Sequence, residues 1–154
     1  MLNRLKSWIA KGTDPILSSL RPTNQAKTVL SESDLQCLKE LQRLPSLGEI
    51  PDRNAPQDVC DAWKHAARMN AVRSTLLDME RLGVSFMFMH MSALSPTSRR
   101  SHAERSGEIF TAREVIDFWA NPANRVNCKC TLLVVLLDDD GKPLIPSIGQ
   151  RSKA

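Results

Sequence analysis

The side chains of this sequence that could do chemistry gather between Arg99 and Thr131. This segment holds His102, one of three histidines in the chain, and it closes with Cys128 and Cys130, two of the four cysteines. Imidazole and thiolate groups are the usual ligands of zinc, and imidazole is also the commonest general base. The segment therefore permits three interpretations, which are metal binding, acid–base catalysis and a structural role.

Metal binding is the first interpretation. A structural zinc site needs four nitrogen or sulfur ligands. Cys128 and Cys130 would point to the same face of a strand, where His102 and His90 could supply the other two ligands. A Cys-x-Cys spacing is less suited to zinc than Cys-x-x-Cys. We therefore expect no metal and no other cofactor, and we keep zinc as an alternative.

Metal-independent cleavage of RNA is the second interpretation. His102 would act as the general base, and the charges of Arg99 and Lys129 would hold a phosphate. A second acid–base group would come from a set without any special spacing, namely Glu104, Ser106 and Glu108. Because none of these stands out, catalysis remains an alternative and the sequence favours a protein that is not an enzyme.

A structural role is the third interpretation, and it is the one that the residues favour. His102 would hydrogen-bond to backbone or carboxylate groups, and Gly107 would form a turn with positive φ. Arg99 would donate to loop carbonyls, while Cys128 and Cys130 would be small, buried apolar groups. No ligand is needed for any of these roles.

The same residues resemble the phage Mu protein F-like family of minor head proteins. The resemblance rests on the order and spacing of Arg99, His102, Gly107, Phe110, Asn127, Cys128, Lys129 and Cys130. Upstream, the stretch around Arg68 is similar to the Arg-rich helix that precedes this motif in the family. The similarity covers roughly residues 66 to 141, about half of the chain.

The sequence departs from the family pattern at three places. Ser106 stands where Asp or Asn is usual before the glycine, and Lys129 stands where Arg is usual between the cysteines. An Asp that commonly precedes the arginine of the motif is absent before Arg99. The resemblance therefore depends on the two halves of the motif occurring together.

The resemblance implies a structural protein of a tailed-phage head. Minor head proteins of this family associate with the portal and take part in head morphogenesis. The implied partners are the portal or major capsid protein, with sister copies and packaged DNA as further contacts. The implied location is the virion head, after assembly in the host cytoplasm. Similar domains are also fused in bacterial polymorphic toxins, which keeps the ribonuclease alternative open.

Length and composition are those of one globular domain. The chain has 154 residues, of which 42% are hydrophobic and 25% charged, with a net charge of +4. This mild positive charge suits contact with nucleic acid or an acidic protein, but it is also ordinary for a soluble protein. No run approaches the ~20 apolar residues that span a bilayer, so we expect no membrane partner. Without a signal-peptide pattern, we expect reduced cysteines.

A leucine stripe precedes the core. Ser31 and Asp34 form a capping box that starts a helix, and Pro45 ends it. Within this helix four leucines repeat at helical spacing, and we expect them to bind a partner or to pack on the long helix that follows: Leu35, Leu38, Leu41 and Leu44.

Proline and glycine residues divide the chain. The Pro-rich stretch 45–56 predicts a linker, so residues 1–55 are interpreted as a helical arm with its linker and 56–146 as the core. Residues 147–154 would form a tail. Near the start of the arm, an amphipathic pattern is made by Leu2, Leu5, Trp8 and Ile9.

Periodicity predicts an α+β core with a small, mainly antiparallel sheet. A long helix is expected over 57–82, with Gly83 at its C-terminal cap. Alternating residues predict a strand over 84–90, and a second capping box predicts a short helix from Thr111. The apolar run 131–137 predicts a central strand that is covered on both faces.

Overall fold

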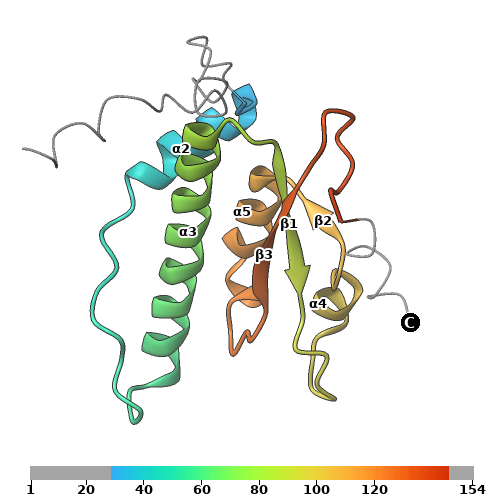
Figure 1. The fold of residues 1–154 in the computed structure, drawn as a ribbon. Helices are drawn as coiled ribbons and strands as arrows, with labels where there is room; N and C mark the ends of the chain where they lie inside the picture. The colour runs from blue at the N-terminus through green and yellow to red at the C-terminus, as the bar shows by residue number, and fades with distance from the viewer. Residues whose placement is uncertain (1–28, 146–154) are drawn as a thin grey trace, which may run out of the picture.

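The computed structural model describes residues 29–145, and these form helices beside a small antiparallel sheet (Figure 1). The predicted amphipathic arm at Leu2, Leu5, Trp8 and Ile9 and the predicted tail 147–154 lie outside the described residues. The elements, in chain order, are α2 (Glu32–Gln42), α3 (Gln57–Leu82), β1 (Phe86–Met91), α4 (Arg100–Glu104), β2 (Ile109–Phe110), α5 (Ala112–Ala120), the 3-10 helix η1 (Pro122–Asn124) and β3 (Thr131–Leu136).

The sheet has the strand order β2-β1-β3, and both pairings are antiparallel. Phe88 on the central strand β1 lies opposite Phe110 on one side and Val134 on the other. This arrangement confirms the predicted α+β class with a long helix, an antiparallel sheet and a short helix after it.

The predicted position of the last strand was wrong. β3 lies at the edge of the sheet, and Leu133, Val134 and Leu136 are 49%, 42% and 40% exposed. The central strand is β1, because it pairs with both neighbours. A continuous apolar run is typical of a strand that is covered on both faces. The run alone does not determine which other elements pack on the strand, or whether any do.

Helix α2 begins at the predicted capping box. The Ser31 hydroxyl accepts a hydrogen bond from the Asp34 backbone N–H at 3.1 Å, and the Asp34 carboxylate accepts from the Ser31 N–H at 3.1 Å. The guanidinium of Arg113 on α5 donates to both carboxylate oxygens of Glu40, at 2.9 and 3.0 Å. This bidentate pair fixes α2 to α5, and α2 therefore belongs to the folded unit.

The leucine stripe is divided between the interior and the surface. Leu41 is 3% exposed and lies in the core, and Leu38 packs against it. Leu35 and Leu44 are each 37% exposed. Of the two predicted roles, packing within this chain applies to Leu38 and Leu41. Leu41 is already covered by this chain, so a partner would meet Leu35 and Leu44.

Helix α3 has the predicted bounds, and Gly83 ends it in the left-handed conformation with φ 67°. Glycine is favoured there because a Cβ destabilises that conformation. The N-terminal half of the helix buries Asp61, and the C-terminal half buries Val72 and Leu76. None of the helices in the described part of the chain is long and apolar enough to cross a membrane.

Helix α5 closes the core against α3 and the sheet. Its capping box, Thr111 with Glu114, is the one that the sequence predicts. The helix buries one face. The core that results combines Leu30, just before α2, with residues from α2, α3, β1, α5 and the segment before β3: Cys37, Leu41, Met69, Val72, Leu76, Phe88, Ala112, Val115, Trp119, Cys128 and Cys130. Burial of these apolar groups is the main force that holds the helices on the sheet.

Candidate functional site

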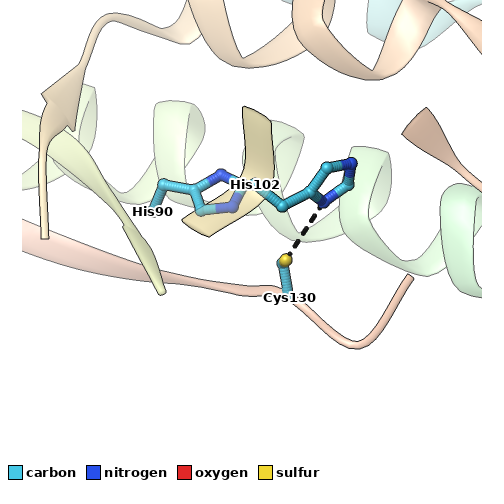
Figure 2. A group of neighbouring side chains, drawn as sticks. All are labelled: His90, His102 and Cys130. Carbon is cyan, nitrogen blue, oxygen red and sulfur yellow. Dashed lines mark hydrogen bonds between the residues drawn. The ribbon is translucent and has the colours of Figure 1, made fainter. Parts of the chain in front are cut away.

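The fold brings the histidine and both cysteines of the motif together in the interior. The Nδ1 atom of His102, on α4, lies 3.2 Å from the sulfur of Cys130 and 3.6 Å from the sulfur of Cys128. All three side chains are buried, and the dashed line in Figure 2 marks the shorter contact. The side chain of His102 is only 2% exposed, so it is an interior group rather than a surface one.

A second histidine from the sheet joins them. His90, on β1, is 1% exposed, and one potential ligand atom each of His90, His102 and Cys130 lie within 4.8 Å of one another (Figure 2). The ring of His90 stacks on Trp119 at a centroid distance of 5.3 Å and an interplanar angle of 15°. Phe118 lies edge-on to both imidazoles. Aromatic rings thus enclose the two histidines.

Gly107 positions this pair of histidines. Its φ is 80°, as the structural interpretation predicts, and its N–H donates to the carbonyl of His90 at 2.7 Å. The His90 N–H in turn donates to the carbonyl of Glu108 at 3.0 Å. The turn after α4 is therefore attached to β1 at the level of His90, which sets His102 beside the strand.

Arg68 holds the cysteine segment from the opposite side. Its guanidinium donates to the carbonyl of Cys128 at 2.8 Å and to that of Cys130 at 3.3 Å. It also lies over the ring of Trp119, 5.1 Å from the centroid. Residues 128–130 form no strand, so this arginine supplies hydrogen bonds that a neighbouring strand would otherwise give.

Arg99 and Asp61 hold the loop that leads to the cysteines. Arg99 donates to the carbonyls of Val126 at 2.9 Å and Asn124 at 3.2 Å, which confirms its predicted role. The buried carboxylate of Asp61 accepts the N–H of Asn127 at 2.8 Å, where the chain has a positive φ of 48°. Asn tolerates this conformation better than most residues.

The sequence interpretation missed Asp61. Its signal is the spacing of Asp61, His65 and Arg68 on α3, which continues the buried positions Val72 and Leu76 at intervals of three and four. Polar residues in line with buried apolar ones indicate polar groups that face the interior. His90 was considered only as an additional zinc ligand, and its place in an alternating strand indicates no more than burial.

The two neighbouring thiols differ in acidity. The pKa of Cys128 is lowered, chiefly because its thiolate would accept the S–H of Cys130 and also the Cys130 backbone N–H, with the positive charge of Arg68 adding to the effect. The pKa of Cys130 is raised, because Cys130 is the thiol that keeps the shared proton and because it is buried. The pair therefore loses a first proton readily and a second one with difficulty.

The buried histidines keep unpaired nitrogens. Within the described residues, the Nε2 atoms of His90 and His102 have no hydrogen-bond partner. Burial, with the nearby charge of Arg105 and smaller effects of His102 and Arg68, lowers the pKa of His90 to about 4. His90 is therefore neutral at pH 7 and has a free lone pair. Leaving a buried polar nitrogen unpaired costs about 1–3 kcal/mol, which calls for an explanation.

A polar pocket leads to this site from the surface. Its volume is about 220 Å³, and it is lined by Ser92, Ala93, Ser95, Thr97, Ser98, Arg99, His102, Val126, Asn127, Cys128, Lys129 and Cys130. The alternative catalytic residues Arg99, His102 and Lys129 therefore share one pocket. The leucine stripe on α2 contributes nothing to its lining.

Comparison with known proteins identifies no relative of this chain. No protein-family model, no curated protein and no solved structure matches it.

Proposed function

We propose that this chain is a structural protein of a tailed-phage head, a minor head protein with a Mu F-like core that joins the portal or major capsid protein during assembly. The observation that carries the proposal is the arrangement of the motif residues. Arg68 and Arg99 hold backbone carbonyls, and Gly107 connects a turn to β1. A motif that is used to build the fold suits a protein that acts by presenting a rigid surface.

Exposed apolar side chains on β3 support a role in assembly. Val134 and Leu136 lie two residues apart, so they share one face of an edge strand. The carbonyl of Leu136 already accepts the N–H of Leu144 at 3.0 Å, so the side-chain face of β3, rather than its backbone, is what another chain would contact. Contiguous exposed apolar side chains favour such contacts. We propose this face of β3, together with Leu35 and Leu44 on α2, as the contact with the portal, the capsid or a sister copy in the virion head.

Incorporation into phage particles tests the proposal. The double variant Val134→Asp, Leu136→Asp should be lost from purified heads while its melting temperature stays near that of the wild type. Val59→Asp on α3 is the matched control, because Val59 is also exposed, at 47%, and lies on another element. Normal incorporation of the double variant, or absence of the wild-type protein from heads, would contradict the proposal.

The position of the gene gives a second test. A head protein should be encoded beside terminase and portal genes, and a toxin should be encoded beside a small immunity gene. The neighbourhood of the gene separates the two functions without any protein experiment.

A metal-independent ribonuclease remains the second candidate, because Arg99, His102 and Lys129 line one pocket. Two features weigh against it. The His102 ring is buried with its Nδ1 atom facing the Cys130 sulfur, and the Arg99 side chain is held against two loop carbonyls, so both groups already have structural roles.

Lys129 offers the sharpest test of the ribonuclease. It is exposed, so Lys129→Ala should leave stability unchanged whichever function is right. A ribonuclease would lose RNA cleavage in this variant and in a stably folded His102→Ala variant. We expect no cleavage of RNA by the wild-type protein, and cleavage that both substitutions abolish would establish the enzyme.

A further inference from the structure

We propose that His90, His102, Cys128 and Cys130 form a structural zinc site in the interior of this protein. The proposal goes beyond the function in the phage head, which requires no metal. It rests on the positions of the four side chains and on their burial.

The separations between the His102 nitrogen and the two cysteine sulfurs are close to those of a metal site. With Zn–S near ~2.3 Å and Zn–N near ~2.0–2.1 Å, the ligand atoms of one tetrahedral zinc lie roughly 3.3–3.8 Å apart. The Nδ1 atom of His102 lies 3.2 Å from the Cys130 sulfur and 3.6 Å from the Cys128 sulfur. A donor atom of His90 lies within 4.8 Å of those of His102 and Cys130. The Cys128 sulfur is near His102 but does not belong to that group, so the side chains of His90 and Cys128 would have to move closer together to bind one ion.

The donor set selects the metal. Two thiols and two imidazoles in a closed site favour zinc, whereas magnesium and calcium require oxygen ligands. No carboxylate belongs to the group that the described residues form around His90, His102 and Cys130. Four protein side chains would fill all four positions of a tetrahedral ion and leave none for a water molecule, which is typical of a structural zinc site rather than a catalytic one.

The surroundings would hold the ligands in place. Arg68 holds the backbone carbonyls of both cysteines, and Gly107 fixes His90 relative to α4. Phe118 and Trp119 cover the imidazoles, and the pocket lined by His102, Cys128 and Cys130 gives the ion a route from the surface. Such supporting contacts orient metal ligands before the metal binds.

The ion would connect three parts of the chain. His90 is on β1, His102 is on α4, and the two cysteines lie just before β3. α4 has five residues, and the ion would add to the hydrogen bonds that attach the turn after it to β1. Zinc that binds the folded state and not the unfolded state would increase the free energy of unfolding.

Elemental analysis of the wild-type protein, purified without a polyhistidine tag and without chelator, is the primary test. We expect one zinc per chain. Cys130→Ser and His102→Ala should each lose this zinc, and Cys128→Ser should lose it as well. The matched controls are Cys37→Ser and Cys60→Ser, which remove the other two cysteines and should retain zinc in full.

A variant can lose zinc because it fails to fold, so the second test uses the wild-type protein. Its metal should be removed with a chelator and zinc then titrated back, with the melting temperature as the readout. We expect a lower melting temperature in the metal-free protein and full recovery at one equivalent of zinc. Cobalt(II) in place of zinc should give thiolate charge-transfer bands and the intense visible bands of a tetrahedral site.

Three results would overturn the proposal. They are wild-type protein that contains no zinc and gains no stability from added zinc, cobalt spectra without thiolate bands, and equal zinc content in the Cys130→Ser and Cys37→Ser proteins. If the wild-type protein neither contains zinc nor gains stability from it, the contact between His102 and Cys130 is a hydrogen bond. Full zinc content in Cys128→Ser would remove Cys128 from the ligand set.

Discussion

The two halves of helix α3 face two different kinds of interior. Its C-terminal half places Val72 and Leu76 in an apolar core, where both are completely buried. Its N-terminal half turns Asp61 and Arg68 toward the cysteine segment. There Asp61 accepts a hydrogen bond from a backbone N–H, and Arg68 donates to two backbone carbonyls. One continuous helix therefore supports an apolar core at one end and a polar site at the other.

Cys37 and Cys128 lie in these two kinds of interior and differ in acidity. Cys37 packs in the apolar part, and burial is the largest cause that raises its pKa. Cys128 is also buried, yet hydrogen bonds from Cys130 and the charge of Arg68 lower its pKa. The same residue type is an inert core group in one place and a potential ligand in the other, so burial alone does not define the role of a cysteine.

The largest effect should come from the apolar half of α3. Leu76→Ala removes a side chain with no exposed surface and should lower the free energy of unfolding by about 2–5 kcal/mol. Leu77→Ala, one residue along and 48% exposed, should change it by less than about 1 kcal/mol. Urea denaturation measures both variants. Similar losses in the two proteins would show that this face of α3 is not the one in the core.

The polar half should respond less, but through a different mechanism. Arg68→Ala leaves the carbonyls of Cys128 and Cys130 without their donor and should cost about 2–3 kcal/mol. Arg81→Ala is the matched control, because its ion pair with Asp78 is exposed and is worth less than about 1 kcal/mol. Denaturation in urea again gives the values, and equal losses would contradict the structural role of Arg68.

A third effect concerns the dependence of stability on pH. Burial, with the charges of Arg125 and Arg68, lowers the pKa of His65 on α3 to about 4. In the unfolded chain histidine titrates near ~6.5, so between these values the unfolded state binds more protons than the folded state. The stability should therefore be highest above pH ~6.5 and should fall as the pH approaches ~4.

His65→Gln isolates this contribution. Its melting temperature should fall less steeply between pH 6.5 and pH 4, the two ends set by the unfolded and folded pKa of His65, than that of the wild type. Parallel pH profiles for the two proteins would show that His65 is charged in the folded state as readily as in the unfolded one.

The helices could be predicted from the sequence because their signals are local. The capping boxes at Ser31 and Thr111 and the cap at Gly83 lie where the structure has them. α4 and β2 were missed, since elements of five and two residues are too short for a hydrophobic period to develop. The place of β3 in the sheet was missed because strand order depends on pairing between distant segments.

The candidate site could be predicted only in part. The roles of Arg99 and Gly107 followed from residue type, since an arginine near a loop donates to carbonyls and a glycine permits a positive φ. The approach of His90 to His102 could not be predicted, because it depends on a turn that packs α4 against β1. Asp61 acts across 66 residues of chain, which a local pattern does not indicate.

The difference between the two interiors should also affect how fast the thiols of Cys128 and Cys37 are alkylated. Thiols react as thiolates, so in chelator-treated protein at pH 7 an alkylating reagent should modify Cys128 before Cys37. Cys128 also lines the pocket, whereas Cys37 has no exposed surface. Mass spectrometry of peptides from a time course measures the two rates. Raising the pH should accelerate Cys37 more than Cys128, because only the thiol with the raised pKa gains thiolate over that range. Modification of Cys37 at the same rate as Cys128, with the same dependence on pH, would mean that the polar and apolar interiors do not differ in the way that their contacts indicate.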